Sequence, residues 1–398
     1  KFGALMIDRR KFLSIGLIGL SSVALSACSS SKEQKAVEYY HEEAYGIIDT
    51  TGTWVIEPKF NRISTPVKGL CIASPFRSGD SFWGIVNLSG EWIVKPLFSR
   101  ISTPVKGLCA ASISKGSDSF CGIMNLSGEW IIEPKWKDIG SLSELDYFGA
   151  QDVESGLWGI ARKDGSWQVE PYLGANKSHS AIGAFNSHTQ RAKAYDAVSD
   201  LWGFIDGSGK WVVKPFTKWI DYVGDDKIHA SSPADNILYG LIDTEGNWIV
   251  EPKFKVIGDF GKTGCAYAES GETELVGLID KQGNWVIEPK FSYIRTPNKS
   301  NFIPAKKYIE GKRSGDLLWG FIDLSGEWVV EPKYLDVGSY NEKCDVASVC
   351  PEGAGSLFRL MNSKEEFVSE QYFSEVFAFS DEGYCDARPY KLEKPSEE

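Results

Sequence analysis

One short pattern recurs along the chain and constrains its fold more than any other feature. In its fullest copy, residues 318–334, it reads LWGFIDLSGEWVVEPKY, a strand, a turn and a return strand. Asp323 can hydrogen-bond the backbone two residues on, and Gly326 can adopt a positive φ, as in a type I turn followed by a left-handed glycine. Pro332 cannot donate to a strand ladder, so it ends the strand or lies at an edge. The pattern therefore predicts a β-hairpin.

The hairpin recurs with a fixed internal spacing of nine residues between its leading residue and a second aromatic residue. A ninth copy keeps the spacing with Phe358 and Phe367 and is degenerate elsewhere. The first eight pairs are Tyr45 and Trp54, Trp83 and Trp92, Cys121 and Trp130, Trp158 and Trp167, Trp202 and Trp211, Tyr239 and Trp248, Val276 and Trp285, and Trp319 and Trp328. Copies begin 37 to 44 residues apart. A period of this length indicates a solenoid, a propeller or another repeat array.

The full pattern is an aromatic residue and glycine, a short apolar strand, Asp or Asn, a glycine three residues later, Trp two residues after it, and an ending such as Glu-Pro-Lys-Phe. This pattern resembles the WG-repeat (KWG-type) family of bacterial proteins. The resemblance covers residues 36–395, which we divide into nine repeats with a degenerate last copy. It implies a repeat β architecture, usually in exported or surface proteins, and it implies no agreed biochemical activity.

The strands have adjacent apolar residues, as in Ile47-Ile48 and Val329-Val330. A sheet with one face in water would alternate instead, so we expect each hairpin to be covered on both faces. The glycine after the leading residue would let a backbone or a Trp ring approach closely. We predict an all-β fold of tandem repeats of short β-meanders. Four strands in about 40 residues favour a β-propeller. An open superhelical β array is the alternative because nine copies exceed the usual blade number, and two separate assemblies are a third arrangement.

Residues 1–28 are expected to be a targeting segment and are kept out of the fold. Arg9 and Arg10 resemble a twin-arginine export signal, although Sec export stays open. The apolar run at 13–25 is shorter than the ~20 residues of a membrane span. It ends in Leu-Ser-Ala-Cys, which resembles a bacterial lipobox with Cys28 as the lipidated residue; a plain secretory signal is the alternative. We therefore expect a polar tether at 29–35 and a lipid anchor in the cell membrane, with the protein outside the cytoplasm, on the cell surface or the periplasmic face.

The net charge of the chain excludes one class of partner. The formal net charge is −11, and nucleic-acid binding needs clustered Lys and Arg, so no nucleic-acid partner is expected.

The chain has eight cysteines, and Cys28 belongs to the lipobox. Five of the remaining seven cysteines share one repeat phase, and equivalent points of packed sheets lie about 10 Å apart. That distance is too long for disulfides, so they should be small core residues. They are Cys71, Cys109, Cys265, Cys344 and Cys385. Only Cys344 and Cys350 form a local pair that could be bridged.

No catalytic or metal-binding constellation is recognisable. Asn replaces Asp freely at the turn position, which fits turn chemistry better than a calcium ligand. Lys95 and Lys214 interrupt the row of Glu residues before proline, which fits a solvated rim better than paired catalytic carboxylates. The four histidines occupy no repeated position and show no zinc spacing. We predict no catalytic residue, no metal and no cofactor.

The repeat tryptophans should anchor the core, because one fixed strand phase suits packing between sheets. Aromatic residues in the variable connections are better candidates for ligand contact. The candidates are Trp136, Trp219, Tyr222 and Tyr308. Our hypothesis is a non-catalytic scaffold of the cell envelope that binds a protein or a cell-wall polymer. A glycan-binding module that uses the exposed aromatics is one alternative, and an enzyme acting on envelope polysaccharides is another.

Overall fold

The computed structural model describes residues 43–75, 82–115, 118–174, 180–222, 228–231, 238–261, 263–297, 302–311 and 316–390, without the side chains of Lys115, Tyr222 and Ile228. The chain divides into two units, residues 1–39 and 40–398. The first unit, with the expected targeting segment, Cys28 and the tether at 29–35, lies outside the described residues. No helix in the described part is long and apolar enough to cross a membrane.

The described part of the second unit contains thirty strands and no α-helix. The first fifteen are β1 (Tyr45–Asp49), β2 (Trp54–Ile63), β3 (Leu70–Pro75), β4 (Trp83–Asn87), β5 (Trp92–Phe98), β6 (Arg100–Ile101), β7 (Leu108–Lys115), β8 (Asp118–Asn125), β9 (Trp130–Trp136), β10 (Asp138–Ile139), β11 (Tyr147–Gln151), β12 (Trp158–Arg162), β13 (Trp167–Leu173), β14 (Arg191–Asp196) and β15 (Leu201–Asp206). The others are β16 (Trp211–Thr217), β17 (Ile220–Tyr222), β18 (Ile228–Ser231), β19 (Tyr239–Ile242), β20 (Trp248–Ile257), β21 (Ala266–Ser270), β22 (Val276–Ile279), β23 (Trp285–Ile294), β24 (Ile303–Lys307), β25 (Trp319–Ile322), β26 (Trp328–Val337), β27 (Ala347–Pro351), β28 (Arg359–Met361), β29 (Phe373–Val376) and β30 (Tyr384–Pro389).

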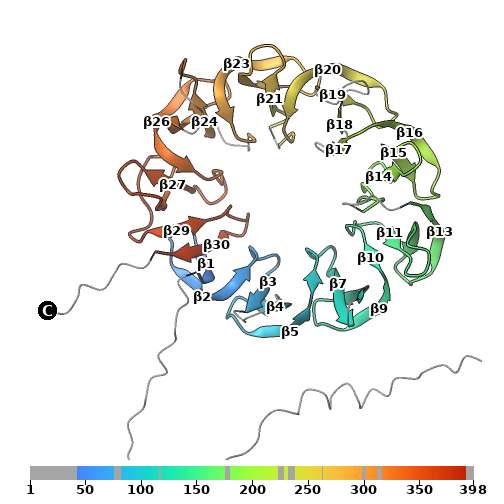
Figure 1. The fold of residues 1–398 in the computed structure, drawn as a ribbon. Helices are drawn as coiled ribbons and strands as arrows, with labels where there is room; N and C mark the ends of the chain where they lie inside the picture. The colour runs from blue at the N-terminus through green and yellow to red at the C-terminus, as the bar shows by residue number, and fades with distance from the viewer. Residues whose placement is uncertain are drawn as a thin grey trace, which may run out of the picture. The chain divides into compact units, whose positions relative to one another are not determined.

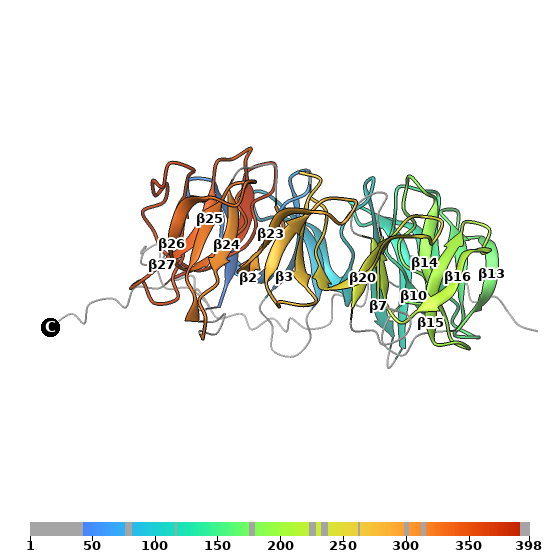
Figure 2. The same ribbon diagram turned by 90° about the horizontal axis from the view of Figure 1, so that it is seen from above.

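Antiparallel sheets of about four strands repeat along the chain, and β10 to β13 show the plan. Their order in the sheet is their order in the chain, with β10 at the inner edge and β13 at the outer edge in Figure 1. Longer return strands belong to two successive sheets, because the first half of β20 pairs with β19 and the second half with β21. Seen from above, neighbouring sheets stand side by side with loops at both ends of their strands (Figure 2).

The first and last repeats share one sheet. Strand β30 pairs with β1, with Gly46 opposite Ala387, and the order of this sheet is β29-β30-β1-β2-β3-β4-β5 (Figure 1). Thr65 Oγ1 donates to Asp386 Oδ1 at 2.7 Å across the same contact. The prediction of an all-β repeat fold is confirmed. Joined ends fit a closed, propeller-like array of the second unit and not the open superhelical alternative.

The hairpin turn forms as predicted. Asp323 Oδ1 accepts hydrogen bonds from the backbone N–H groups of Ser325, at 2.8 Å, and Glu327, at 3.1 Å. Gly326 has a φ of 82°. The turn carboxylate is therefore used by its own loop.

The glycine after the leading residue is required by the return strand. A Cβ on Gly320 would lie 2.3 Å from the carbonyl oxygen of Val330, and one on Gly122 would lie 2.5 Å from that of Ile132. Bulges in the return strand bring these carbonyl groups over the glycines. The predicted close approach of a backbone is confirmed, and any larger residue would displace the return strand.

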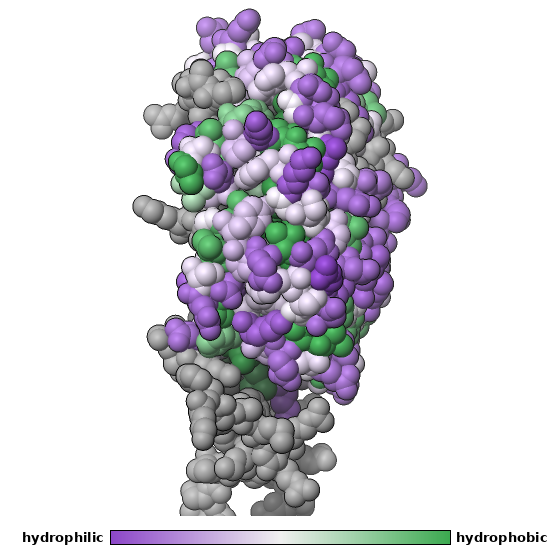
Figure 3. Space-filling model, turned by 90° about the vertical axis from the view of Figure 1, so that its right-hand side faces the viewer, coloured by the Kyte–Doolittle hydropathy of each residue, from purple (hydrophilic) through white to green (hydrophobic). Residues whose placement is uncertain are grey.

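The two strands of a hairpin differ in burial. Phe321 and Ile322 on β25 are both fully buried, as the adjacent apolar pairs predicted. On β26, Val329 is 46% exposed while Val330 is 2% exposed. The prediction that both faces of each hairpin are covered is therefore wrong for the return strand, because the first half of this strand pairs only with β25 and one of its faces meets solvent. Polar and apolar side chains are accordingly interspersed on the face shown in Figure 3.

The repeat tryptophans lie between successive repeats and are half-buried. Trp328 meets the ring of Phe291 edge-on, with centroids 5.6 Å apart. The same contact joins Trp92 to Phe60, Trp130 to Phe98, Trp167 to Trp136, Trp248 to Phe216, Trp285 to Phe254, and Trp54 to Phe373. The last pair links the final repeat to the first. The tryptophans thus pack between neighbouring repeats. They are more exposed than expected from the prediction that they anchor the core.

The lysine of the Glu-Pro-Lys ending adds a second contact between repeats. Lys135 Nζ lies 4.8 Å from the ring of Trp136 and donates to the carbonyl oxygen of Gly165, in the turn of the next repeat, at 2.5 Å. Tyr172 takes this place one repeat later and donates its hydroxyl to the carbonyl oxygen of Gly209 at 2.6 Å. The motif lysine therefore joins the return strand of one repeat to the turn of the next, a role that the sequence analysis missed.

All seven cysteines in the described residues are free, Cys344 and Cys350 included. Cys71, Cys109 and Cys385 are buried, as expected for small core residues, and Cys265 is half-buried.

Candidate binding site at a repeat junction

The leading residue of a repeat can fill the junction between two repeats, and Trp319 shows this arrangement. Its side chain is largely buried, at 6% exposure. Tyr293 meets the indole edge-on at 5.5 Å, and the charged ends of Arg295 and Lys306 lie 4.8 and 4.9 Å from its ring. Arg295 also pairs with Asp336 at 3.0 Å. An indole therefore fills the space beneath an Arg–Asp pair.

The third repeat has Cys121 at this position. Ser112 lies opposite Cys121 in the sheet, as Lys306 lies opposite Trp319. Arg100 and Asp138, on the two inner strands β6 and β10, form an ion pair of 2.5 Å beside the thiol. An Arg–Asp pair thus recurs at this junction, although Arg100 stands at the register position of Tyr293 and not of Arg295. The indole and the lysine opposite it are both replaced by small side chains.

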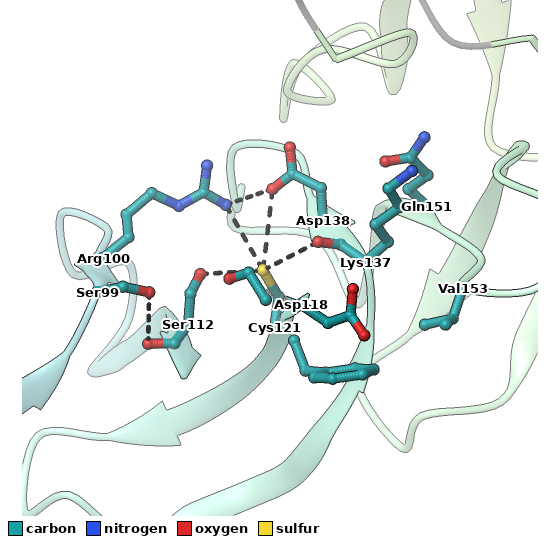
Figure 4. Close-up of a pocket in the computed structure, with 11 residues that line it drawn as sticks. Ser99, Arg100, Ser112, Asp118, Cys121, Lys137, Asp138, Gln151 and Val153 are labelled. Carbon is teal, nitrogen blue, oxygen red and sulfur yellow. Dashed lines mark hydrogen bonds and ion pairs between the residues drawn. The ribbon is translucent and has the colours of Figure 1, made fainter. Parts of the chain in front are cut away.

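A pocket of about 740 Å³ lies at this junction. Its lining consists of Ser99, Arg100, Ser112, Asp118, Ser119, Phe120, Cys121, Lys137, Asp138, Gln151 and Val153. Figure 4 shows Arg100 and Asp138 pointing toward one another above Cys121, with Lys137 and Gln151 on another side. Charged groups of both signs and hydroxyl groups therefore face one space.

The filled junction has a smaller pocket in the corresponding place. It measures about 520 Å³, and Asp316, Leu318 and Leu335 in its lining correspond to Asp118, Phe120 and Lys137. Neither Arg295 nor Asp336 lines that smaller pocket, whereas Arg100 and Asp138 line the larger one. At the Cys121 junction the pocket therefore reaches inward as far as the Arg–Asp pair.

The thiol of Cys121 is not an activated nucleophile. Burial raises its pKa, and the hydrogen bond with Ser112 and the charge of Arg100 oppose this effect without reversing it. The thiolate is the reactive form of cysteine, so little of it is present at neutral pH. The described residues contain no group of three or more His, Cys, Asp or Glu side chains placed to hold a metal ion.

Trp136 is the one predicted ligand contact that the structure moves into the core. It is 2% exposed and packs edge-on against Phe148, with ring centroids 5.4 Å apart. Its assignment to a variable connection was wrong, because it occupies the repeated aromatic position at the end of β9. Its ring has no exposed face for a ligand.

Trp219 lies beside a second junction pocket of about 710 Å³. It is 38% exposed, and its ring lies 4.3 Å from that of His229. Lys193 and Asp221, which form an ion pair of 2.9 Å, line the same pocket. Trp219 therefore keeps the exposed ring that the prediction required. Sequence reasoning missed the pocket, because its lining comes from five separate segments.

Burial lowers the pKa of His229 to about 4, although the charge of Asp221 opposes the shift. Its Nδ1 lies 3.2 Å from the carbonyl oxygen of Ile257, so the neutral ring donates a hydrogen bond there. His229 therefore supports Trp219 as an uncharged ring at neutral pH.

Tyr308 and Tyr222 are the other two predicted contacts. Tyr308 is exposed directly after β24. The backbone of Tyr222 ends β17, opposite Ile228, and its side chain lies outside the described residues. The structure does not bring Trp136, Trp219 and Tyr308 into one site, because each belongs to a different repeat.

Comparison with known proteins identifies the repeat. The sequence profile described as "WG containing repeat" matches residues 45–74, 83–115, 122–167, 202–215, 239–272, 277–308 and 319–350, more than half of the chain. A search of curated protein sequences found no match.

Similar solved structures include Hsv2 from Kluyveromyces lactis with loop 6CD replaced by a Gly-Ser linker, at 10% identity and a TM-score of 0.35, covering 61% of this chain and 86% of that one. They also include the acylaminoacyl peptidase of Pyrococcus horikoshii, at 12% identity and a TM-score of 0.36, covering 78% of this chain and 53% of that one. Likenesses of this size say nothing about function.

Proposed function

Because the chain belongs to the family of WG containing repeat proteins, we propose that it is a non-catalytic binding scaffold that holds its partner at the inner junctions between repeats. The observation that carries the proposal is that some repeated positions hold the fold together, while others vary between repeats and line the pockets. Gly320, Asp323 and Trp328 each serve the backbone or the packing of the fold. Leading residues such as Cys121 and inner-strand residues such as Arg100 vary between repeats and line the pockets.

The proposed location is the cell envelope, with a lipid anchor at Cys28. The lipobox-like sequence before Cys28 supports this assignment. A protein or a cell-wall polymer is the proposed partner, because a repeat array offers a broad surface whose variable positions can change without harm to the packing. Replacement of Cys28 by Ser should release the protein from the membrane fraction, and unchanged fractionation would contradict the anchor.

The binding proposal is tested by quantitative capture from envelope extracts of the native host. Lys137→Glu reverses an exposed charge in the Cys121 pocket, and Lys95→Glu makes the same change on the outer strand β5. We expect Lys137→Glu to reduce capture at least tenfold and Lys95→Glu to leave it unchanged. Equal capture by both variants would place recognition away from the junction, and no enrichment with the unaltered protein would argue against the scaffold itself.

Glycan binding is a second candidate, which the setting of Trp219 favours. An exposed indole beside the Lys193–Asp221 pair offers an apolar ring face and polar groups, the two kinds of contact that a sugar ring needs. Titration with cell-wall saccharide fragments should give saturable binding that Trp219→Ala abolishes. Tyr390→Ala removes an exposed aromatic ring that is not among the candidates and is the matched control. Absence of binding across a glycan array would remove this candidate.

A further inference from the structure

We propose that the pocket between the last and the first repeats binds a small zwitterion, with an alkylated ammonium group beside Asp386 and an acidic group on Arg62. This pocket, the seam pocket, measures about 230 Å³. Its lining consists of Tyr45, Arg62, Ile63, Ser64, Trp83, Phe377 and Asp386. The inference goes beyond the scaffold function, because it assigns a small ligand to a pocket that neither Cys121 nor Trp219 lines.

The equivalent pocket beside Trp219 shows what the seam pocket lacks. Asp386 and Lys193 hold the same place in their sheets, since each lies opposite the residue two positions after the leading residue of a hairpin. Ser64 and Asp221 also correspond, since each directly follows an isoleucine that pairs with an alanine. Lys193 and Asp221 form an ion pair of 2.9 Å. At the seam an acid replaces the lysine and a hydroxyl group replaces the acid, so this ion pair cannot form.

Asp386 is therefore left without a cation. Its Oδ1 accepts a hydrogen bond of 2.7 Å from Thr65, while Arg388, two residues on, pairs with Glu375 at 3.5 Å. Burial raises the pKa of Asp386; the hydrogen bond from Thr65 opposes this effect, and the charge of Glu375 adds to it. In the part of the chain that the structure describes, Asp386 forms no ion pair. A cation in the pocket would stabilise the carboxylate that burial disfavours.

Three aromatic side chains supply the preference for an alkylated ammonium group. Tyr45, Trp83 and Phe377 line the pocket, and the ring centroids of Tyr45 and Phe377 lie 6.2 Å apart. Tyr45 already meets one cation of the chain, because the guanidinium of Arg388 lies 5.7 Å from its ring. Aromatic rings attract cations, and alkyl groups on the nitrogen add apolar contact with the rings. Rings beside a carboxylate therefore favour an alkylated ammonium group over a metal ion.

Arg62 supplies the preference for an acidic group. It lies opposite Ser74 as Arg100 lies opposite Ser112, so the two arginines hold the same place in successive repeats. Arg100 pairs with Asp138, the residue at this place in the next repeat. For Arg62 the corresponding residue is Arg100 itself, and the exposed Arg62 forms no ion pair among the described residues. A guanidinium group binds a carboxylate or a phosphate through parallel hydrogen bonds.

The seam pocket thus has two opposite charges in its lining that are not paired with each other. A ligand that carries both signs satisfies both side chains at once. The pocket is smaller than the roughly 300 Å³ at which sites for drug-sized ligands begin. The ligand is therefore a small molecule of the betaine type or a head group of the phosphocholine type, which share this chemistry.

Calorimetric titration of the full chain with glycine betaine and with phosphocholine tests the proposal. The compound 3,3-dimethylbutanoate is the matched control for glycine betaine, because a carbon atom replaces the charged nitrogen and the carboxylate is kept. Tetramethylammonium carries the cation without an acidic group. We expect saturable binding of at least one zwitterion at one site, and at least tenfold weaker binding of both control probes.

Three variants locate the binding site. Asp386→Asn removes the charge, keeps an acceptor for Thr65 and should weaken binding of the zwitterion at least tenfold. Arg62→Gln should also weaken it, and should not weaken binding of tetramethylammonium. Asp381→Asn removes an exposed carboxylate of the same repeat outside the pocket, and it should bind as the unaltered protein does.

No saturable binding of either zwitterion, equally tight binding of a control probe, or unchanged binding by Asp386→Asn would overturn the proposal. An equal loss in Asp381→Asn would also overturn it. If Asp386→Asn fails to fold, Phe377→Leu provides the test, because it removes an exposed ring of the pocket. Unchanged binding by this variant would then overturn the proposal.

The two sources of the zwitterion are distinguished by vesicles of phosphatidylcholine. Tighter binding of phosphocholine, with flotation on these vesicles that Asp386→Asn abolishes, would identify a lipid head group. Tighter binding of glycine betaine without flotation would identify a free small molecule.

Failure of this inference can be told apart from failure of the scaffold function. Capture from envelope extracts is tested through Lys137, which does not line the seam pocket. If the unaltered protein binds neither zwitterion but still captures its envelope partner, the seam site is wrong and the scaffold function stands.

Discussion

The Trp319 and Cys121 junctions share one backbone plan and differ in what fills it. Both place an Arg–Asp ion pair next to the leading residue of a hairpin, with Arg100 at the register position that Tyr293 holds at the other junction. At one junction an indole lies beneath the pair, and at the other a thiol leaves the pocket open as far as the arginine. The comparison shows that the leading residue can change from large to small while the glycine, the turn and the repeat tryptophan hold the hairpin in place.

The largest expected effect comes from opening the filled junction. Trp319→Cys should lower the free energy of unfolding by about 3–5 kcal/mol, because a buried aromatic side chain is removed and a cavity is left behind. Urea unfolding followed by far-UV circular dichroism measures the loss. Trp219→Ala, at a half-exposed tryptophan, should cost less. A loss below about 1 kcal/mol for Trp319→Cys would mean that the indole does not support its junction.

The junction of Trp219 should respond to acid through His229. Burial holds the pKa of His229 near 4 in the folded chain, whereas an unfolded histidine titrates near 6.5. The unfolded chain therefore binds the extra proton first, and the stability that the neutral ring contributes is present above about pH 6.5 and lost as the pH falls toward 4. We expect a loss on the order of 2–3 kcal/mol.

The difference between the unaltered protein and His229→Gln isolates this effect, because both share the titration of the carboxylates. Urea unfolding at pH 7 and pH 4.5 should show a smaller acid-induced loss for His229→Gln. Equal losses would show that the His229 ring is exposed to solvent in the folded protein.

Filling the open junction should have a smaller effect of opposite sign. Cys121→Trp is expected to raise the free energy of unfolding by about 1 kcal/mol, as a cavity-filling change does. Cys109→Trp, at a closely packed cysteine, should be destabilising and is the matched control. A loss above about 1 kcal/mol for Cys121→Trp would mean that Arg100 and Asp138 already occupy the space of the indole.

The hydrogen bond from the motif lysine to the next turn should give the smallest effect. Lys135→Met removes the hydrogen bond to Gly165 and should cost about 0.5–1.5 kcal/mol. Lys137→Met, two residues on, removes an exposed lysine of the pocket and should cost less than about 0.5 kcal/mol. Equal costs would show that the contact between neighbouring turns adds nothing to stability.

The sequence predicted the repeating part of the fold well because that part depends on local chemistry. Asp323 and Gly326 specify a turn, and Gly320 indicates a close backbone approach, without reference to any other repeat. The half-exposure of the repeat tryptophans was missed because it depends on which strand forms the outer edge of each sheet.

The candidate site was harder to predict because its residues meet only through the pairing of strands. Arg100 and Asp138 are 38 positions apart. The sequence did contain one signal, since Cys121 departs from the leading aromatic residue of most other repeats. Its meaning required the register that places Ser112 beside it and the Arg–Asp pair above it. Trp136 was misplaced for a related reason, because its repeat ends in tryptophan where most others end in phenylalanine.

A crystal structure of the Cys121→Trp variant would test most directly whether the leading residue alone decides if a junction is filled or open. The account predicts that the new indole lies in the pocket with its face against Arg100, as Trp319 lies against Arg295, while Arg100 stays paired with Asp138. An indole that points into solvent, or an Arg100–Asp138 pair that separates to admit it, would contradict the account.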